Sequence, residues 1–176
     1  LSGDGNTLAV GAPAEASGST GINSTPDESA AGAGAAYVFT RSAGTWTQQA
    51  YVKASNTGGS DDFGTSVALS RDGNALAVGA PREDGNGTGI EPGSDEGAAN
   101  SGAVYFFSRS AGVWAQQSYV KATNTQSEDR FGRSVTLSGD GNALAVGAIG
   151  EDSDGTGIGG PQGNNNDPQS GAAYLY

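Results

Sequence analysis

The stretch Ser70-Arg-Asp-Gly-Asn-Ala-Leu-Ala-Val-Gly79 decides the fold, because the chain contains it three times. Ser2-Gly-Asp-Gly-Asn-Thr-Leu-Ala-Val-Gly11 lies 68 residues before it, and Ser138-Gly-Asp-Gly-Asn-Ala-Leu-Ala-Val-Gly147 lies 68 residues after it. Aromatic residues keep the same spacing, since Trp46 recurs as Trp114. A disordered chain does not keep aromatic residues in register over such distances, so the sequence predicts a folded tandem array.

Each repeat predicts four short strands, shown best by the second copy. Residues 63–70 are rich in small and β-branched residues, and residues 74–80 alternate bulky with small side chains. Residues 102–107 and 113–122 form the third and fourth expected strands. Asp72-Gly73, between the first two, favours a type I′ hairpin turn. The sequence therefore predicts an antiparallel four-stranded unit without helices.

Four antiparallel strands in a period above about 40 residues predict a β-propeller blade. The expected fold is all-β, with about two and a half repeats of 68 residues. Residues 1–62 form a first blade without its first strand, 63–130 a complete blade, and 131–176 a third blade without its fourth strand. A β-sandwich of ten strands is the alternative, which the strict recurrence disfavours.

A chain of two and a half blades is expected to have open sheet edges. Closed propellers contain about 4–8 blades, so two and a half blades leave unpaired strand edges and apolar faces. The sequence contains no Met, which favours a piece of a longer product. The expected partners are other blades of the same parent chain or copies of the chain itself.

Composition excludes several functions. The net charge of −11 would repel nucleic acid, and the chain has no apolar run long enough to span a membrane. The absence of Cys and His removes disulfides, thiolate catalysis and the commonest general base. Adjacent carboxylates such as Asp61-Asp62, Glu128-Asp129 and Glu151-Asp152 are expected to lie on exposed loops and stay ionised. The sequence therefore predicts no enzyme.

The net charge is concentrated in three long loops between the second and third strands of each repeat. These loops carry −3, −4 and −4, while the rest of the chain is balanced. The loops are expected to project from one rim of the propeller and to form a single acidic, Gly-rich face. Such a face would suit a cationic surface, a glycan or a partner bridged by a metal. The sequons at Asn23 and Asn86 lie in these loops, and glycosylation there stays open.

Two of these loops carry the oxygen pattern of a calcium site. Oxygen side chains fall at positions 1, 3 and 5 before a glycine at position 6, and only oxygen ligands are present, which favours calcium over zinc or copper. Asp95 falls at position 12 in the second loop; the third loop would close with Glu151, Asp167 or a backbone carbonyl. A solvated acidic loop is the alternative. The candidate metal ligands are Asp84, Asn86, Thr88, Asp95, Glu151, Asp152, Asp154 and Thr156.

Phe63-Gly64 is followed, sixteen residues on, by Gly79-Ala80-Pro81, and Gly11-Ala12-Pro13 matches this pattern. The pattern resembles the FG-GAP repeat of integrin α-subunit propellers and is most similar to bacterial secreted or surface FG-GAP proteins. Gly147-Ala148-Ile149 departs from it at the last position. The resemblance implies a propeller, an extracellular or cell-surface location, calcium-supported blades, and adhesion or ligand binding. The calcium loop usual in the family is reduced here to Asp72-Gly73-Asn74, which offers too few ligands.

The expected function is therefore a non-enzymatic extracellular propeller segment that binds a protein or glycan through acidic, calcium-binding loops. A structural subunit of an extracellular fibre or sheath, assembled through open blade edges, is the alternative. An accessory propeller of a secreted enzyme is a third. Lys53 and Lys121, near the end of the predicted fourth strands, are expected to protect the sheet edge from aggregation.

Overall fold

The computed structural model describes residues 1–93 and 95–176, and within those ranges it contains ten β-strands and no helix. The first sheet consists of β1 (Thr7–Ala12), β2 (Ala35–Ser42) and β3 (Thr45–Val52). The second consists of β4 (Ser66–Leu69), β5 (Ala75–Ala80), β6 (Ala103–Ser110) and β7 (Val113–Val120). The third consists of β8 (Phe131–Leu137), β9 (Leu144–Ala148) and β10 (Ala172–Leu175).

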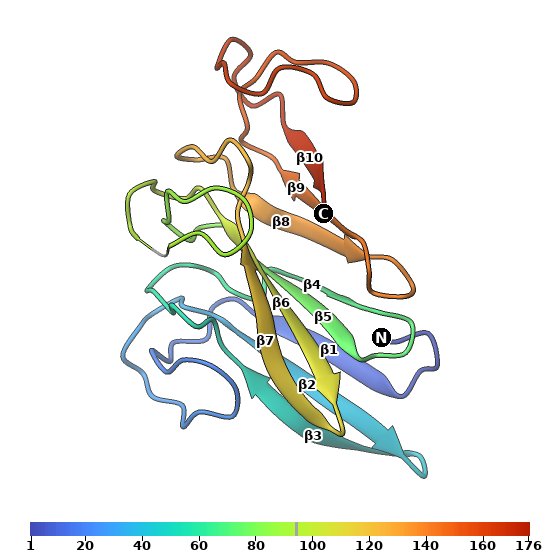
Figure 1. Ribbon diagram of the computed structural model, residues 1–176. Coiled ribbons are helices and arrows are strands. Elements are labelled where there is room, and N and C mark those ends of the chain that lie inside the picture. Colours follow the sequence, from blue (N-terminus) through green and yellow to red (C-terminus); the bar gives the residue numbers. More distant parts are fainter. Residues whose placement is uncertain (94) are drawn as a thin grey trace.

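The three sheets are antiparallel, and within each sheet every strand pairs with the strands next to it in sequence. The predicted all-β fold, with blades of three, four and three strands, is confirmed. The second blade lies between the other two, because β4 contacts β1 and β8 contacts β4 and β5. Figure 1 shows the three sheets following one another as separate blades.

The strand β5 shows why its sequence alternates bulky and small residues. Leu76 and Val78 belong to a core shared with the first blade, whereas Ala77 belongs to a core shared with the third blade. Both faces of β5 are therefore buried, as expected for a sheet covered on both sides. The bulky face fills one core and the small face allows the next blade to approach.

The blades approach each other most closely at glycines. A Cβ atom on Gly11 would overlap the carbonyl oxygen of Gly64, and one on Gly79 would overlap that of Gly132. Gly64 and Gly132 also have φ angles of +93° and +88°, which side chains of L-residues rarely adopt. The Phe-Gly pair at the start of one blade therefore lies directly against the Gly-Ala pair of the preceding blade.

The phenylalanine of each Phe-Gly pair anchors an aromatic cluster within its own blade. In the second blade the ring of Phe63 lies edge-on to Tyr105 and Phe107, with ring centroids 5.3 and 6.3 Å apart. The third blade repeats this cluster, with Phe131 as its centre. Edge-to-face contacts of this kind add to the free energy of burying the rings.

The tight turn between β4 and β5 is not the type I′ turn that its Asp-Gly sequence predicts. A type I′ turn requires positive φ at both central residues, but only Gly73 has one, at 70°. The carboxylate of Asp72 instead accepts hydrogen bonds from the hydroxyl of Ser70 (2.6 Å) and the backbone N–H of Asn74 (3.0 Å). These side-chain hydrogen bonds stabilise a turn in which Gly73 has a positive φ and Asp72 does not.

We expect Gly79→Ala to lower the free energy of unfolding by about 1–3 kcal/mol, because the added methyl group would strike backbone that cannot rotate away. Denaturant-induced unfolding measures the change. Gly163→Ala is the control, since a Cβ there meets no heavy atom within 4 Å. Equal stability of the two variants would contradict the tight contact between blades.

Candidate functional site

Three long loops leave the same end of the three sheets. They comprise residues 13–34, 81–102 and 149–171, and are called here the first, second and third loop. Figure 1 shows the first two at the opposite end of the strands from the tight turns that join β2 to β3 and β6 to β7. Since the strand order is the same in each blade, the fold gathers the acidic segments at one end of the molecule.

Each loop is braced by one short side chain that accepts backbone N–H groups from across the loop. In the second loop, Oδ1 of Asp95 accepts the N–H of Asn86 at 2.9 Å and that of Gly97 at 3.3 Å. Asp27 in the first loop and Asn164 in the third also accept two backbone N–H groups each. The side chain predicted to close a calcium site therefore stabilises the loop backbone.

Two further carboxylates hold the last turn before a strand. Oδ1 of Asp84 accepts the N–H of Asn100 at 2.7 Å, and Oδ1 of Asp152 accepts that of Gln169 at 2.6 Å. Asn100 and Gln169 have φ angles of 51° and 59°, in the left-handed region that non-glycine residues seldom adopt. The carboxylates therefore stabilise strained backbone just ahead of β6 and β10.

The remaining candidate ligands are spread over the loops. Asn86, Thr88 and Thr156 are exposed, and Oδ2 of Asp154 accepts a hydrogen bond from the amide of Asn166 at 3.0 Å. In the described ranges 1–93 and 95–176, no three acidic side chains converge so as to hold a metal ion. The donor set has the oxygen chemistry of calcium, and calcium binding by these loops stays a prediction.

Glu83 is the centre of a buried polar cluster at the base of the second loop. Glu83 is 1% exposed, and its Oε2 accepts a hydrogen bond from Nζ of Lys121 at 2.7 Å. Its Oε1 accepts the hydroxyl of Tyr119 at 2.7 Å and the amide of Asn56 at 3.0 Å. Lys121 also donates to the hydroxyl oxygen of Ser101 at 2.7 Å. This cluster ties the loop to β7 and to the segment that joins the first two blades.

The first blade contains a matching ion pair. Nζ of Lys53 donates to Oε2 of Glu15 at 3.0 Å and to the carbonyl oxygen of Gly34 at 2.5 Å. The expectation that Lys53 and Lys121 protect an exposed sheet edge is wrong, because both side chains are completely buried. The signal that identifies the pairs is their spacing, since the lysine follows its glutamate by 38 residues in both copies.

Two more buried carboxylates lie just before the Phe-Gly pairs. Asp61 and Asp129 accept the N–H of Gly58 and of Gln126, at 2.8 and 2.7 Å. They were expected to be exposed and ionised, but they are 4% and 3% exposed. Burial raises the pKa of Asp61 to about 7 and that of Asp129 to about 6, although the backbone N–H bonds oppose the shift. Neighbouring acidic groups add to it.

The chain consists of antiparallel blades in tandem, and the Phe-Gly pair of each later blade packs against the Gly-Ala pair of the blade before it. These features define a β-propeller-like repeat protein. The FG-GAP repeat family matches residues 46–107 and 114–176, so the chain belongs to that family. A search of curated proteins found no significant match. The described residues also include no helix long and apolar enough to cross a membrane.

The raised pKa values predict that the protein loses stability as the pH rises. In an unfolded chain these carboxyls titrate near pH 3.9, so the folded state binds their protons more tightly. The resulting stabilisation is present below about pH 4 and is lost as the pH approaches 6 to 7. We expect the melting temperature to fall over this range, and Asp61→Asn with Asp129→Asn to raise it at pH 8 by about 5 °C.

Asp140→Asn, in an exposed turn, is the control. The melting temperature of this variant should still fall between pH 4 and 7. If the melting temperature of the double variant fell as much over this pH range as that of the wild type, Asp61 and Asp129 would not be the cause of the pH dependence.

Proposed function

We propose that this FG-GAP segment is a non-enzymatic extracellular binding module that holds a positively charged partner against its three acidic loops. The observation that carries the proposal is the placement of charge. The three loops account for the whole net charge of −11, and they leave the same end of the blades. A surface of one sign attracts partners of the opposite sign and speeds their association.

The charge that a partner would meet is carried by exposed side chains. Glu15 and Glu83 do not contribute, since buried lysines neutralise them. The exposed acidic loop residues are Asp27, Glu28, Glu91, Asp95, Glu96, Asp154 and Asp167. The extracellular setting is supported by the family, because FG-GAP repeats are typical of extracellular proteins. A basic protein surface is the partner class that this charge suits best.

A labelled decalysine peptide tests the acidic face. We expect Glu28→Gln, Glu96→Gln and Asp167→Asn together to weaken its binding about fivefold or more, and added salt to weaken binding to the wild type. Fluorescence anisotropy gives both dissociation constants. The matched control removes three exposed carboxylates at the opposite end of the blades, with Asp4→Asn, Asp72→Asn and Asp140→Asn. Equal losses in the two triple variants would show that the loops have no special role.

Calcium binding by the second and third loops stays a prediction. Oδ1 of Asp84 and Oδ1 of Asp152 already accept backbone N–H groups, so an ion would bind the other oxygen of each carboxylate and the loops would close around it to supply the remaining ligands. We expect millimolar calcium to raise the melting temperature, and Asp152→Asn with Asp154→Asn to reduce the rise, while magnesium at the same concentration has a smaller effect. Identical melting curves with and without calcium would leave the loops as acidic surfaces alone.

Assembly into an extracellular fibre or sheath is a second candidate function. The specific observation in its favour is the outer edge of β10, which pairs with β9 on one side and with no strand on the other in the described part of the chain. An unpaired edge of this kind is a template for strand addition.

A further inference from the structure

In the second blade, one buried carboxylate holds both an amine and a carboxamide. Oε2 of Glu83 accepts a hydrogen bond from Nζ of Lys121 at 2.7 Å, and Oε1 accepts one from Nδ2 of Asn56 at 3.0 Å. Lys121 is completely buried, Glu83 is 1% exposed, and Asn56 is half-buried. The amine and the carboxamide therefore lie on the two oxygens of a single carboxylate, at a place with little access for water.

The environment of Lys121 favours the neutral, nucleophilic form of its amine. Burial lowers the pKa of Lys121, although the charge of Glu83 opposes the shift. In the described part of the chain, two of the three protons on Nζ have acceptors, which are Oε2 of Glu83 and Oγ of Ser101. Transfer of one proton to Glu83 leaves an amine with a free lone pair, and a desolvated lysine amine is a good nucleophile.

The carboxamide of Asn56 is held in a way that favours attack on its carbon atom. The hydroxyl of Tyr105, which is completely buried, donates a hydrogen bond to Oδ1 of Asn56 at 2.6 Å. A donor at this oxygen stabilises the negative charge that develops there when a nucleophile adds to Cγ. The hydroxyl of Tyr119 donates to Oε1 of Glu83 at 2.7 Å and so helps to fix the carboxylate between the two reacting groups.

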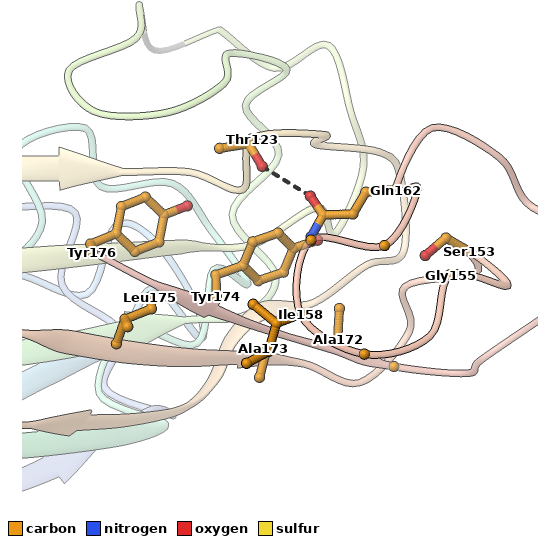
Figure 2. Close-up of a pocket in the computed structure, with 14 residues that line it drawn as sticks. Thr123, Ser153, Gly155, Ile158, Gln162, Ala172, Ala173, Tyr174, Leu175 and Tyr176 are labelled. Carbon is orange, nitrogen blue, oxygen red and sulfur yellow. Dashed lines mark hydrogen bonds between the residues drawn. The ribbon is translucent and has the colours of Figure 1, made fainter.

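The same placement of an asparagine between a glutamate and a tyrosine recurs in the third blade. Nδ2 of Asn124 donates to Oε1 of Glu151 at 2.9 Å, and the hydroxyl of Tyr174 donates to Oδ1 of Asn124 at 2.6 Å. Figure 2 shows Tyr174 and Gln162 on the wall of one cavity, and the carbonyl oxygen of Gln162 accepts a second hydrogen bond from Asn124 at 2.7 Å. The repeat itself therefore orients the carboxamide in this way.

We propose that Lys121 and Asn56 form an intramolecular isopeptide bond, with Glu83 as the proton carrier and Tyr105 as the donor to the carbonyl oxygen. Nζ of Lys121 adds to Cγ of Asn56, so that the Nζ–Cγ bond forms and the Cγ–Nδ2 bond breaks. Nζ gives up two protons in total. Glu83 passes one of them to Nδ2, which leaves as ammonia, and the other leaves with it as ammonium while Glu83 returns to a carboxylate. The reaction consumes no oxidant and no further reactant.

This bond would fasten the end of β7 to the segment that joins the first two blades. It would close a loop of about 65 residues, and a covalent closure of this length stabilises the fold by restricting the unfolded chain, as a disulfide does. The sequence contains no cysteine that could supply a disulfide. The bond is independent of the acidic loop surface proposed above, so failure of one proposal leaves the other standing.

Mass spectrometry of the purified 176-residue chain tests the bond. We expect the denatured chain to be lighter than the mass of its sequence by one ammonia. A protease digest should contain a branched peptide in which the segment around Asn56 is joined to the segment around Lys121. The branched peptide distinguishes the proposed bond from a succinimide at Asn86-Gly87, which releases ammonia without joining two segments.

The matched variants are Glu83→Gln and Glu15→Gln, each of which removes a carboxylate that is paired with a buried lysine. Glu83→Gln cannot carry the proton and should reduce the branched peptide about tenfold or more, whereas Glu15→Gln should keep it. If Glu83→Gln fails to fold, the mass and the digest of the unchanged chain still decide. Full mass in the unchanged chain, loss of ammonia without the branched peptide, or equal amounts of branched peptide in the two variants would each overturn the proposal.

Discussion

The backbone contact between successive blades is the constraint on which the structure depends. The carbonyl oxygen of Gly64 lies where a Cβ atom on Gly11 would be, and the contact recurs between Gly132 and Gly79. A carbonyl in a paired strand cannot move without moving the strand, and protein interiors leave little free volume. The missing Cβ atoms therefore set the distance between blades, and with it the places where each loop and linker emerges.

The buried lysines fix the fourth strand within its own blade. The pairing of β7 with β6 places the end of β7 over the base of the second loop, where Lys121 contacts Glu83 and Ser101. A slip of one residue in β7 would turn Lys121 to the other face and leave Glu83 buried alone. Burial itself lowers the pKa of Lys121, and the charge of Glu83 opposes that shift. Pairing of Lys121 with Glu83 therefore favours one register of the fourth strand.

The strands could be predicted from the sequence because their signals are local. Alternation of bulky and small residues along residues 75–80 reflects the two cores on either side of the strand. The burial of Lys121 depends on a partner 38 residues away, so local polarity pointed to a solvated position. The spacing that predicts calcium binding does not by itself assign the role of Asp84. A carboxylate can accept a backbone N–H as readily as it can bind an ion, and the spacing of oxygen side chains does not distinguish the two.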